Sequence, residues 1–333
     1  ADMALLDVKN LNISLQTAMG PARAVRDLNI TLEKGETLGI VGESGCGKSM
    51  TALALMGLLP ENAQTTGELL LSGEDLLKKS EKDMCRIRGN RMAMIFQEPM
   101  TSLNPVHTVG RQIMEPLRLH RGLSKSEAYE DTVRLMDRVG IPNPAERVHN
   151  HPHQLSGGQR QRVMIALALS CSPDILIADE PTTALDVTIQ DQILELIQSL
   201  VAEEGMALVL ISHDLGVIAE NTRKVMVMYG GTVVESGTTD HIFGELTHPY
   251  TQGLFAAMPK LGMGRQRRLT TIPGTVPDLI NLPKGCTFTD RCPLASSGCR
   301  ETAPVLSDLG SGHTVICHNL DQAKDARNGE LYT

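Results

Sequence analysis

The chain has 333 residues, of which 41% are hydrophobic, and its 39 acidic against 31 basic residues give a formal net charge of −8. This length predicts one or two domains with an ample core. The negative charge disfavours a nucleic-acid-binding protein, which should present a basic face. No apolar run approaches the roughly 18 residues that span a bilayer, and the start at Ala1-Asp2-Met3 does not resemble a signal peptide. We therefore expect a cytoplasmic protein that reaches a membrane only through partners.

The N-terminal part, residues 1 to about 95, is predicted to form strands around a glycine-rich loop. The loop reads Gly42-Glu43-Ser44-Gly45-Cys46-Gly47-Lys48-Ser49 and fits G-x-x-x-x-G-K-[ST] at every fixed position. It follows an apolar strand at 37–41 and precedes a helix expected over 50–59. A glycine-rich turn without a ligand is the alternative, but composition alone seldom places Lys-Ser there. We call Gly42–Ser49 the phosphate loop.

Each residue type in this loop suits a bound nucleoside triphosphate. Glycines let successive backbone N–H groups point at phosphate oxygens at the positive end of the helix. Lys48 would reach the β and γ phosphates, and the Ser49 hydroxyl would ligate magnesium. Cys46 lies where Lys48 and the N–H groups would favour a thiolate. We favour the simpler interpretation that Cys46 is only a small residue that fits the loop. The residues predicted to contact nucleotide here are Gly42, Ser44, Gly45, Cys46, Gly47, Lys48, Ser49 and Met50.

The segment from Gln97 to Gln154 is predicted to be mostly helical. Its clearest helix begins at the capping box Ser124-x-x-Glu127 and stops at Gly140. Histidines 149, 151 and 153 alternate near the end of the segment 97–154 and suggest a metal site. We disfavour that interpretation because Pro152 breaks any regular face that they could share.

Leu155-Ser156-Gly157-Gly158-Gln159, here called the signature segment, precedes another predicted helix. A serine and two glycines at a helix start offer backbone N–H groups and a hydroxyl, which suit a second anion site. For an isolated Ser-Gly-Gly, a helix cap with a flexible lead-in would be the better interpretation.

A buried strand at 175–179 ends in two carboxylates. Asp179 is the natural magnesium partner, and Glu180 could orient or deprotonate an attacking water. Strands often end in acidic residues, so this pattern gains weight only beside the phosphate loop. The next predicted helix, Thr188 to Glu203, has the apolar spacing of a core-facing crossover helix.

The order of these motifs resembles the ATP-binding-cassette ATPases. Gln97 is similar to the family's glutamine that senses magnesium and the membrane partner, and His213 to its histidine that contacts the γ phosphate. Ala184-Leu185-Asp186 resembles the loop that crosses to a second cassette. In that family the signature, here Ser156, Gly157, Gly158 and Gln159, closes over ATP held by the other cassette.

The resemblance implies an α/β fold: a P-loop NTPase (RecA-like) core with an antiparallel β subdomain, a helical insert and a small cysteine-rich C-terminal extension. We expect the ATP-binding core at 1–96 and 155–242. The helical subdomain at 97–154 would dock on membrane subunits, and the extension would occupy 243–333.

One departure from the family concerns the adenine base. The family usually places an aromatic residue ahead of the phosphate loop, yet no Phe, Tyr or Trp occurs before Phe96. By position the base would meet residues 19–24, where the guanidinium of Arg23 could stack instead.

From Phe243 onward Pro and Gly become frequent, and four cysteines follow the spacing C-x5-C-x6-C-x17-C at Cys286, Cys292, Cys299 and Cys317. We call 286–317 the cysteine segment. A reducing compartment disfavours disulfides. Spacing leaves a structural zinc site and an iron-sulfur cluster about level. Cys85 and Cys171 are predicted as packing residues.

The residues around these cysteines resemble the C-terminal extension of dipeptide and oligopeptide importer ATPases. Gly285 to Pro293, Pro304-Val305-Leu306, Cys317-His318 and His248-Pro249-Tyr250-Thr251 carry that resemblance. It implies that the four cysteines ligate a 4Fe-4S cluster, with Zn²⁺ as the alternative. A structural staple suits so short a segment better than electron transfer.

The resemblance implies an ATP-hydrolysing subunit of a peptide importer at the cytoplasmic face of the inner membrane, using ATP and Mg²⁺. Expected partners are a second cassette, more readily a related chain than a copy, two transmembrane permease subunits and a substrate-binding protein. Nucleic acid is not expected. The alternatives are the same role for a nickel-chelate, opine or glutathione importer, a non-transport cassette ATPase, and an iron-sulfur redox protein.

Overall fold

The computed structural model describes residues 3–98, 102–183, 185–258, 271–327 and 330–332. The chain divides into two compact units. Unit 1 comprises 1–32, 37–77 and 210–333, and unit 2 comprises 33–36 and 78–209. Strand β8 (Ala207–Ser212) begins in unit 2 and ends in unit 1, and the chain also passes between the units at 32/33, at 36/37 and within the short helix η1 (Leu76–Lys78).

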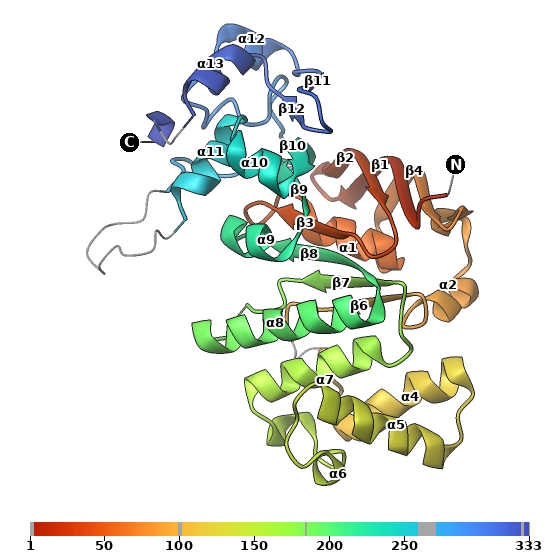
Figure 1. Ribbon diagram of the computed structural model, residues 1–333. Helices are drawn as coiled ribbons and strands as arrows, with labels where there is room; N and C mark the ends of the chain where they lie inside the picture. The colour runs from red at the N-terminus through yellow and green to blue at the C-terminus, as the bar shows by residue number, and fades with distance from the viewer. Residues whose placement is uncertain (1–2, 99–101, 184, 259–270, 328–329, 333) are drawn as a thin grey trace. The chain divides into compact units, whose positions relative to one another are not determined.

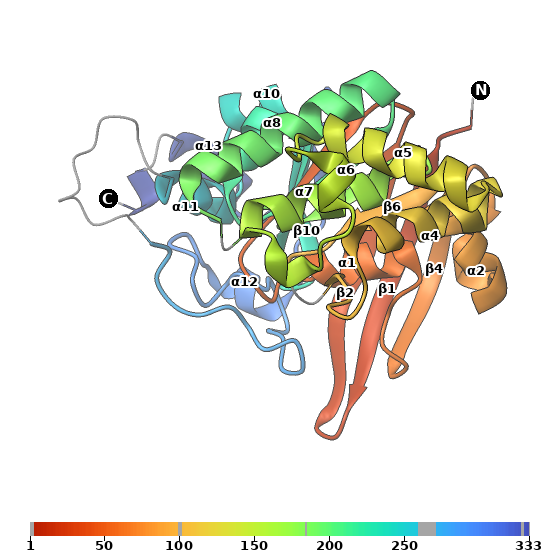
Figure 2. The same ribbon diagram turned by 90° about the horizontal axis from the view of Figure 1, so that it is seen from below.

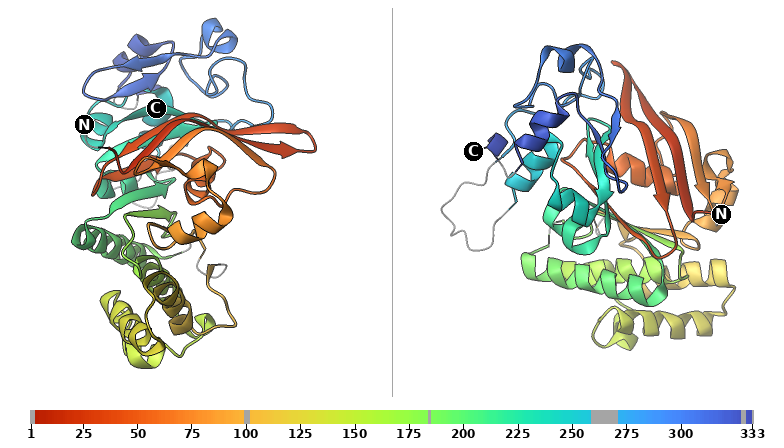
Figure 3. Two further views of the ribbon diagram at one scale, coloured as in Figure 1. Left: turned by 90° about the vertical axis from the view of Figure 1, so that its right-hand side faces the viewer. Right: turned by 45° about the horizontal axis from the view of Figure 1, so that its top comes forward.

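Unit 1 contains an antiparallel four-stranded sheet in the order β2-β1-β4-β5. Figure 3 shows the long strands β1 and β2 with β4 beside them. Leu11 and Ile13 are buried on β1, whereas Leu5 and Leu15 are only half-buried. Register shifts between Val8 and Ser14 interrupt the alternation of buried and exposed positions that a regular strand would show. The strands are β1 (Leu6–Thr17), β2 (Gly20–Leu32), β4 (Ala63–Leu71) and β5 (Glu74–Asp75).

A second set of strands in unit 1 has the neighbour order β11-β12-β10-β9-β3. Strands β3 and β9 are parallel, and the other pairs are antiparallel. The strands are β3 (Thr37–Val41), β9 (Lys224–Tyr229), β10 (Thr232–Thr238), β11 (Leu306–Asp308) and β12 (Thr314–Ile316). The helices of this unit are α1 (Lys48–Met56), α9 (Leu215–Asn221), α10 (Thr239–Gly244), α11 (Pro249–Ala256), α12 (Ser297–Glu301), α13 (Leu320–Asp325) and η3 (Glu330–Tyr332).

Unit 2 places helices against a parallel strand pair, β6 (Met92–Ile95) and β7 (Ile175–Asp179). Helices α4 and α5 pack on each other and on α7, which also contacts α8 and β6 (Figures 1 and 2). Leu117, Ala128 and Cys171 form a small core cluster. The helices are α2 (Glu81–Ile87), α4 (Val109–Arg121), α5 (Lys125–Arg138), α6 (Pro144–Arg147), η2 (Pro152–Gln154), α7 (Gly157–Leu169) and α8 (Val187–Glu204).

Most predicted helices occur within a few residues of their expected ends. Helix α1 begins two residues before the expected start and ends at Gly57, which caps it at φ 66°. The capping box of Ser124 and Glu127 is present, and α5 ends at Arg138, shortly before Gly140. The crossover helix α8 also matches its prediction within one residue at each end.

Two minor predictions concern side chains of unit 2. Cys171 is buried, as expected, but Cys85 is exposed and lies 3.9 Å from the Glu81 carboxylate, so its assignment as a packing residue was wrong. The imidazoles of His151 and His153 stack with centroids 5.7 Å apart. In the described part of the chain these histidines belong to no group of three or more metal-ligating side chains.

Candidate functional site

The phosphate loop lies between β3 and α1 in unit 1, and its glycines are sterically required. Gly45 and Gly47 have φ of +81° and +99°, a region that favours glycine. A Cβ on Gly42 would lie 2.4 Å from the carbonyl oxygen of Met228, and one on Gly47 would lie 2.6 Å from that of Ala24. The loop therefore presses its backbone against neighbouring strands, which fixes the direction of its N–H groups.

The polar side chains of this loop divide into an inner and an outer set. Lys48 is 6% exposed, begins α1, and its Nζ donates to the carbonyl oxygen of Gly42. Ser44 and Ser49 are exposed, and Met50 is half-buried in the first turn. A lysine held across the loop and a hydroxyl at the positive helix end are the groups that a triphosphate with its metal would contact.

Cys46 is a buried packing residue of the loop. Its side chain is 2% exposed, and burial raises the pKa of the thiol, while nearby Lys48 lowers it by less. Its carbonyl oxygen accepts a hydrogen bond of 3.1 Å from the Gly231 N–H. Cys46 therefore packs under the loop as a neutral small residue, which is the interpretation that the sequence favoured over a thiolate.

His213 lies beside this loop in the same unit. A pocket of about 470 Å³ is lined by Glu43 and Ser44 from the loop and by His213 and Asp214 at the start of α9. Asp214 caps α9 by accepting the Gly216 N–H at 2.8 Å. Arg23 is exposed on β2, and its backbone N–H donates to Leu279 at 3.1 Å.

The acidic strand end is in unit 2. All five residues of β7 are buried, including Asp179 at 6% exposed. Glu180 follows with φ 48°, and its Oε2 accepts a hydrogen bond of 3.3 Å from Thr183 Oγ1. A non-glycine residue in the left-handed region costs of order 1–3 kcal/mol, a strain that concentrates at functional positions. Gln97 is exposed after β6.

The signature segment starts α7, as predicted, through a reciprocal capping box. Ser156 Oγ accepts the Gln159 N–H at 3.2 Å, and Gln159 Oε1 accepts the Ser156 N–H at 3.1 Å. Ser156 and Gly157 are exposed. The first N–H groups of a helix have no intrahelical acceptor, so the capped end still offers donors to an anion.

Two neighbouring features fix the start of α7. A Cβ on Gly158 would lie 3.2 Å from Ile189 Cγ2 of α8, and α8 is itself capped by Asp186, which accepts the Ile189 N–H at 3.0 Å. The predicted crossing loop 184–186 thus contributes a helix cap at Asp186, while Ala184 lies outside the described residues.

The four cysteines of the C-terminal extension lie in one region of unit 1. Burial first and the neighbouring thiols second raise the pKa of Cys292 to about 12 and of Cys317 to about 11. Cys286 donates its N–H to Cys299 O at 2.7 Å, and Asn319 Nδ2 donates to Cys299 Sγ at 3.4 Å. Across the described ranges, no three His, Cys, Asp or Glu side chains are placed to hold one metal ion. The four-cysteine metal site therefore remains a prediction.

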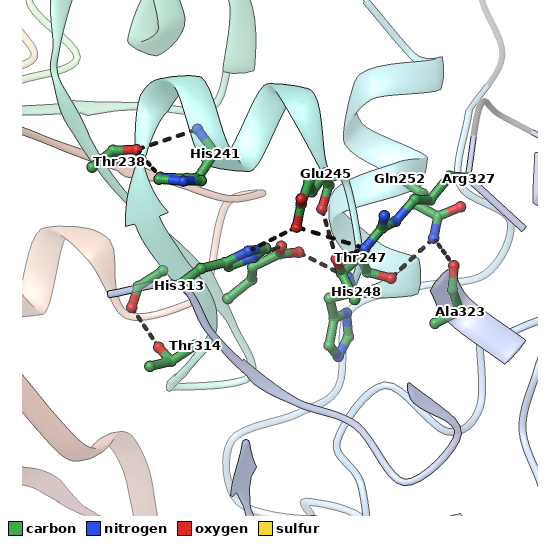
Figure 4. Close-up of polar contacts among 12 residues, drawn as sticks. Thr238, His241, Glu245, Thr247, His248, Gln252, His313, Thr314, Ala323 and Arg327 are labelled. Carbon is green, nitrogen blue, oxygen red and sulfur yellow. Dashed lines mark hydrogen bonds and ion pairs between the residues drawn. The ribbon is translucent and has the colours of Figure 1, made fainter. Parts of the chain in front are cut away.

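Buried polar contacts attach this extension to β10, and Figure 4 shows two of its residues that make them, His313 and His248. His313 Nε2 lies 2.5 Å from Glu235 Oε2, with both side chains at most 1% exposed. Glu235 Oε1 accepts the His248 N–H at 2.8 Å, and His248 Nδ1 accepts the Tyr250 N–H at 3.0 Å. Burial lowers the pKa of His248 to about 3, so its ring is neutral and serves as an acceptor.

Comparison with known proteins gives the same assignment over nearly the whole chain. The ABC transporter family matches residues 25–183. The family described as oligopeptide/dipeptide transporter, C-terminal region, matches residues 234–299.

Curated relatives are similar over almost their full length. A probable peptide ABC transporter ATP-binding protein of Sinorhizobium fredii is 51% identical, covering 94% of both chains. The oligopeptide transport ATP-binding protein OppD of Haemophilus influenzae is 50% identical over 94% of this chain and 96% of its own. The dipeptide transport ATP-binding protein DppD of Escherichia coli is 49% identical over 96% of this chain and 98% of its own.

A solved dimer of the ATP-binding cassette MJ0796, in a post-hydrolysis state with ADP and phosphate, has a TM-score of 0.63 and 27% identity over 70% of this chain and 98% of its own. It supports the α/β P-loop NTPase fold expected from the motifs. The chain therefore belongs to the ATP-binding proteins of ABC transporters, in the branch that carries the oligopeptide/dipeptide transporter C-terminal region.

Proposed function

We propose that this chain is the ATP-hydrolysing subunit of an ABC importer for di- or oligopeptides. The observation that carries the proposal is a phosphate loop whose glycines, lysine and serine are held for a triphosphate, in a chain about half identical to proteins named for peptide import. The extension matched by the peptide-transporter C-terminal family supports the same substrate class.

Within this proposal, each motif has one task. The loop N–H groups and Lys48 bind the phosphates of ATP, and Ser49 and Asp179 hold the accompanying Mg²⁺, which offsets the phosphate charge. Glu180 orients and deprotonates the attacking water. His213 and Gln97 contact the γ-phosphate end, and Arg23 stacks on the base.

The exposed signature segment supports a shared site. Ser156, Gly157, Gly158 and Gln159, with Asp186, complete the ATP site of a second cassette, most simply a related chain. Two cassettes would pair head to tail about a twofold or pseudo-twofold axis. Closure around two ATP molecules and opening after hydrolysis would drive the permease between its two facings.

A groove of about 1290 Å³ between α4, α5 and residues 148–149 supports docking on a permease subunit. It combines apolar and basic side chains, which suit a short amphipathic helix with acidic residues on its polar face. The side chains that carry this inference are Met114, Leu119, Leu123, Arg111, Arg118 and Lys125. No helix in the described ranges is long and apolar enough to cross a bilayer, and we assign the membrane location to this docking. We also propose the division of the chain into an ATP-binding core, a helical subdomain and an extension, with the bounds expected from the sequence.

The four cysteines would hold a 4Fe-4S cluster that staples the extension. Four cysteines lie in one region, and burial together with other cysteines of the set raises the thiol pKa of Cys286, Cys292 and Cys317. Four neighbouring thiols are the donor set that such a cluster requires. Anaerobic purification followed by iron, sulfide and zinc analysis and by absorption spectroscopy tests this. Four iron and four sulfide ions per chain would support the cluster. One zinc ion per chain without sulfide would show that the cysteines bind zinc instead.

The function is tested by co-purifying the chain with its partner subunits and reconstituting the complex in vesicles with its binding protein. Peptide-dependent ATP hydrolysis with peptide uptake is the expected result. Uptake of a nickel chelate, an opine or glutathione in place of peptides would overturn the substrate class and keep the ATPase role.

A further inference from the structure

An arginine of the cysteine segment contacts the phosphate loop directly. Arg291 Nη1 and Nη2 donate to the two carboxylate oxygens of Glu43 at 2.8 and 3.1 Å. The Arg291 side chain is 3% exposed and that of Glu43 is 33% exposed. Glu43 occupies a variable position of the loop motif, so the motif itself does not predict this pair.

The guanidinium of Arg291 is held from every side. Its Nε donates to Pro273 O at 3.0 Å, Nη2 also donates to Ile272 O at 3.1 Å, and Nη1 lies 3.4 Å from Tyr229 Oη. These contacts and the Glu43 pair engage all five N–H donors of the fork. A lysine has three donors and no planar fork, so it could not reproduce them.

The backbone beside Arg291 is shaped to admit it. Gly274 has φ +87°, and a Cβ there would lie 2.9 Å from Arg291 Cγ. The guanidinium carbon also lies 5.7 Å from the centroid of the Tyr229 ring. Because the Arg291 side chain is buried and all its donors are bonded, the pair differs from a salt bridge between two exposed side chains, which contributes little.

A second contact holds the backbone of the same loop residue. The Glu43 N–H donates to Tyr250 Oη at 2.8 Å, and Tyr250 is fully buried. Its ring packs against Tyr229 and Phe288 with centroids 4.6 and 5.4 Å away. Phe288, like Arg291, belongs to the cysteine segment, so that segment contacts the phosphate loop through a side chain and an aromatic cluster.

A carboxylate in a loop that binds a triphosphate creates an electrostatic problem. Like charges placed near each other cost several kcal/mol when poorly solvated. Arg291 offsets the charge of Glu43 and holds both carboxylate oxygens through two hydrogen bonds.

We propose that Arg291 is a positioning residue for ATP binding, which neutralises and orients Glu43 so that the phosphate loop can accept the triphosphate. The cysteine segment is then part of the construction of the nucleotide site as well as a terminal appendage. This inference rests on the proposed ATP binding by the loop.

The test is a double-mutant cycle on the full chain, with ATP affinity measured by labelled-nucleotide titration and folding by thermal unfolding. Arg291→Gln leaves the Glu43 charge in the loop and should weaken ATP binding by at least about tenfold. Adding Glu43→Gln to that variant should recover most of the loss, because the repulsive charge is gone. Arg291→Lys should fall between wild type and Arg291→Gln.

Arg300→Gln is the matched control, since Arg300 is exposed on α12 in the same segment. Wild-type affinity for Arg291→Gln would overturn the inference, as would a double variant no better than the single one, because that pattern indicates structural support alone. If wild type and Arg300→Gln both fail to bind ATP, the proposed function fails instead.

Should Arg291→Gln fail to fold, the comparison moves to Glu43→Gln with and without Arg291→Lys. Both lack the carboxylate, so both should bind ATP within about twofold of each other, as independent sites do once their coupling is removed. A double variant weaker by tenfold would contradict the proposal.

Discussion

The phosphate loop and the cysteine segment are both marked by short sequence patterns, but they differ in how the pattern relates to the structure. The loop carries its signal in its own residues: Gly45 and Gly47 have φ of +81° and +99°, a region that favours glycine. The cysteine segment depends on a distant residue, since its His313 contacts Glu235 of β10, 78 positions earlier in the chain. A local motif thus predicts the geometry of its own residues. A set of widely spaced cysteines predicts only that their side chains should lie close together.

The two regions are nevertheless connected through Arg291 and Glu43. Substitutions in one region therefore test whether its function can be lost while the other region keeps its nucleotide affinity or its metal content.

Lys48→Met should reduce ATP hydrolysis by at least about a hundredfold, because it removes the positive charge that offsets the phosphate charge. Steady-state phosphate release measures this. Iron or zinc content at the cysteines should match wild type. Loss of metal in this variant would show that the two regions are coupled more tightly than one ion pair allows.

Gly47→Ala should weaken ATP binding by about tenfold or more, because the added Cβ, 2.6 Å from Ala24 O, must move the loop. Gly122→Ala is the control: it also has positive φ, at +62°, but nothing lies within 4 Å of its Cβ. It should cost about 1 kcal/mol of stability without changing nucleotide affinity. Equal losses of ATP affinity in both variants would contradict the conclusion that the close contact at Gly47 is needed for nucleotide binding.

Cys292→Ser should abolish metal or cluster content and lower the unfolding temperature by about 5 °C or more, because bound metal contributes folding free energy. Cys85→Ser serves as the control, since Cys85 is exposed on α2. ATP affinity should fall only a few-fold, through the neighbouring Arg291. An unchanged unfolding temperature and metal content would contradict the proposal that a metal or cluster bound by the cysteines stabilises the extension.

His248→Asn should alter the acid sensitivity of folding. The folded pKa of His248, about 3, lies below the unfolded value of about 6.5, so its contribution to stability is present above pH 6.5 and is lost as the pH falls towards 3. Asn keeps a cap acceptor for Tyr250 without titrating. The fall in unfolding free energy below pH 6.5 should therefore be shallower by up to a few kcal/mol. Exposed His153→Asn should leave the slope unchanged, and an equal slope in His248→Asn would refute the assignment.

Sequence patterns predicted the features that depend on neighbouring residues. The capping box at Ser124, the helix start at Ser156, the strand at 175–179 and the glycine loop each follow from a few adjacent positions. The contact of Arg291 with Glu43 joins positions 248 residues apart, and no local pattern encodes it. Cys46 shows the same limit, because its burial, which raises the thiol pKa, depends on the packing of the loop.

We propose that Glu180 activates water at an ATP site completed by a second cassette. The decisive measurement is made on Glu180→Gln in the co-purified complex, with bound nucleotide, cassette pairing and phosphate release followed on one sample. We expect retained ATP, paired cassettes and hydrolysis slower by about a hundredfold or more. Near-normal phosphate release, or loss of ATP binding with separated cassettes, would contradict it.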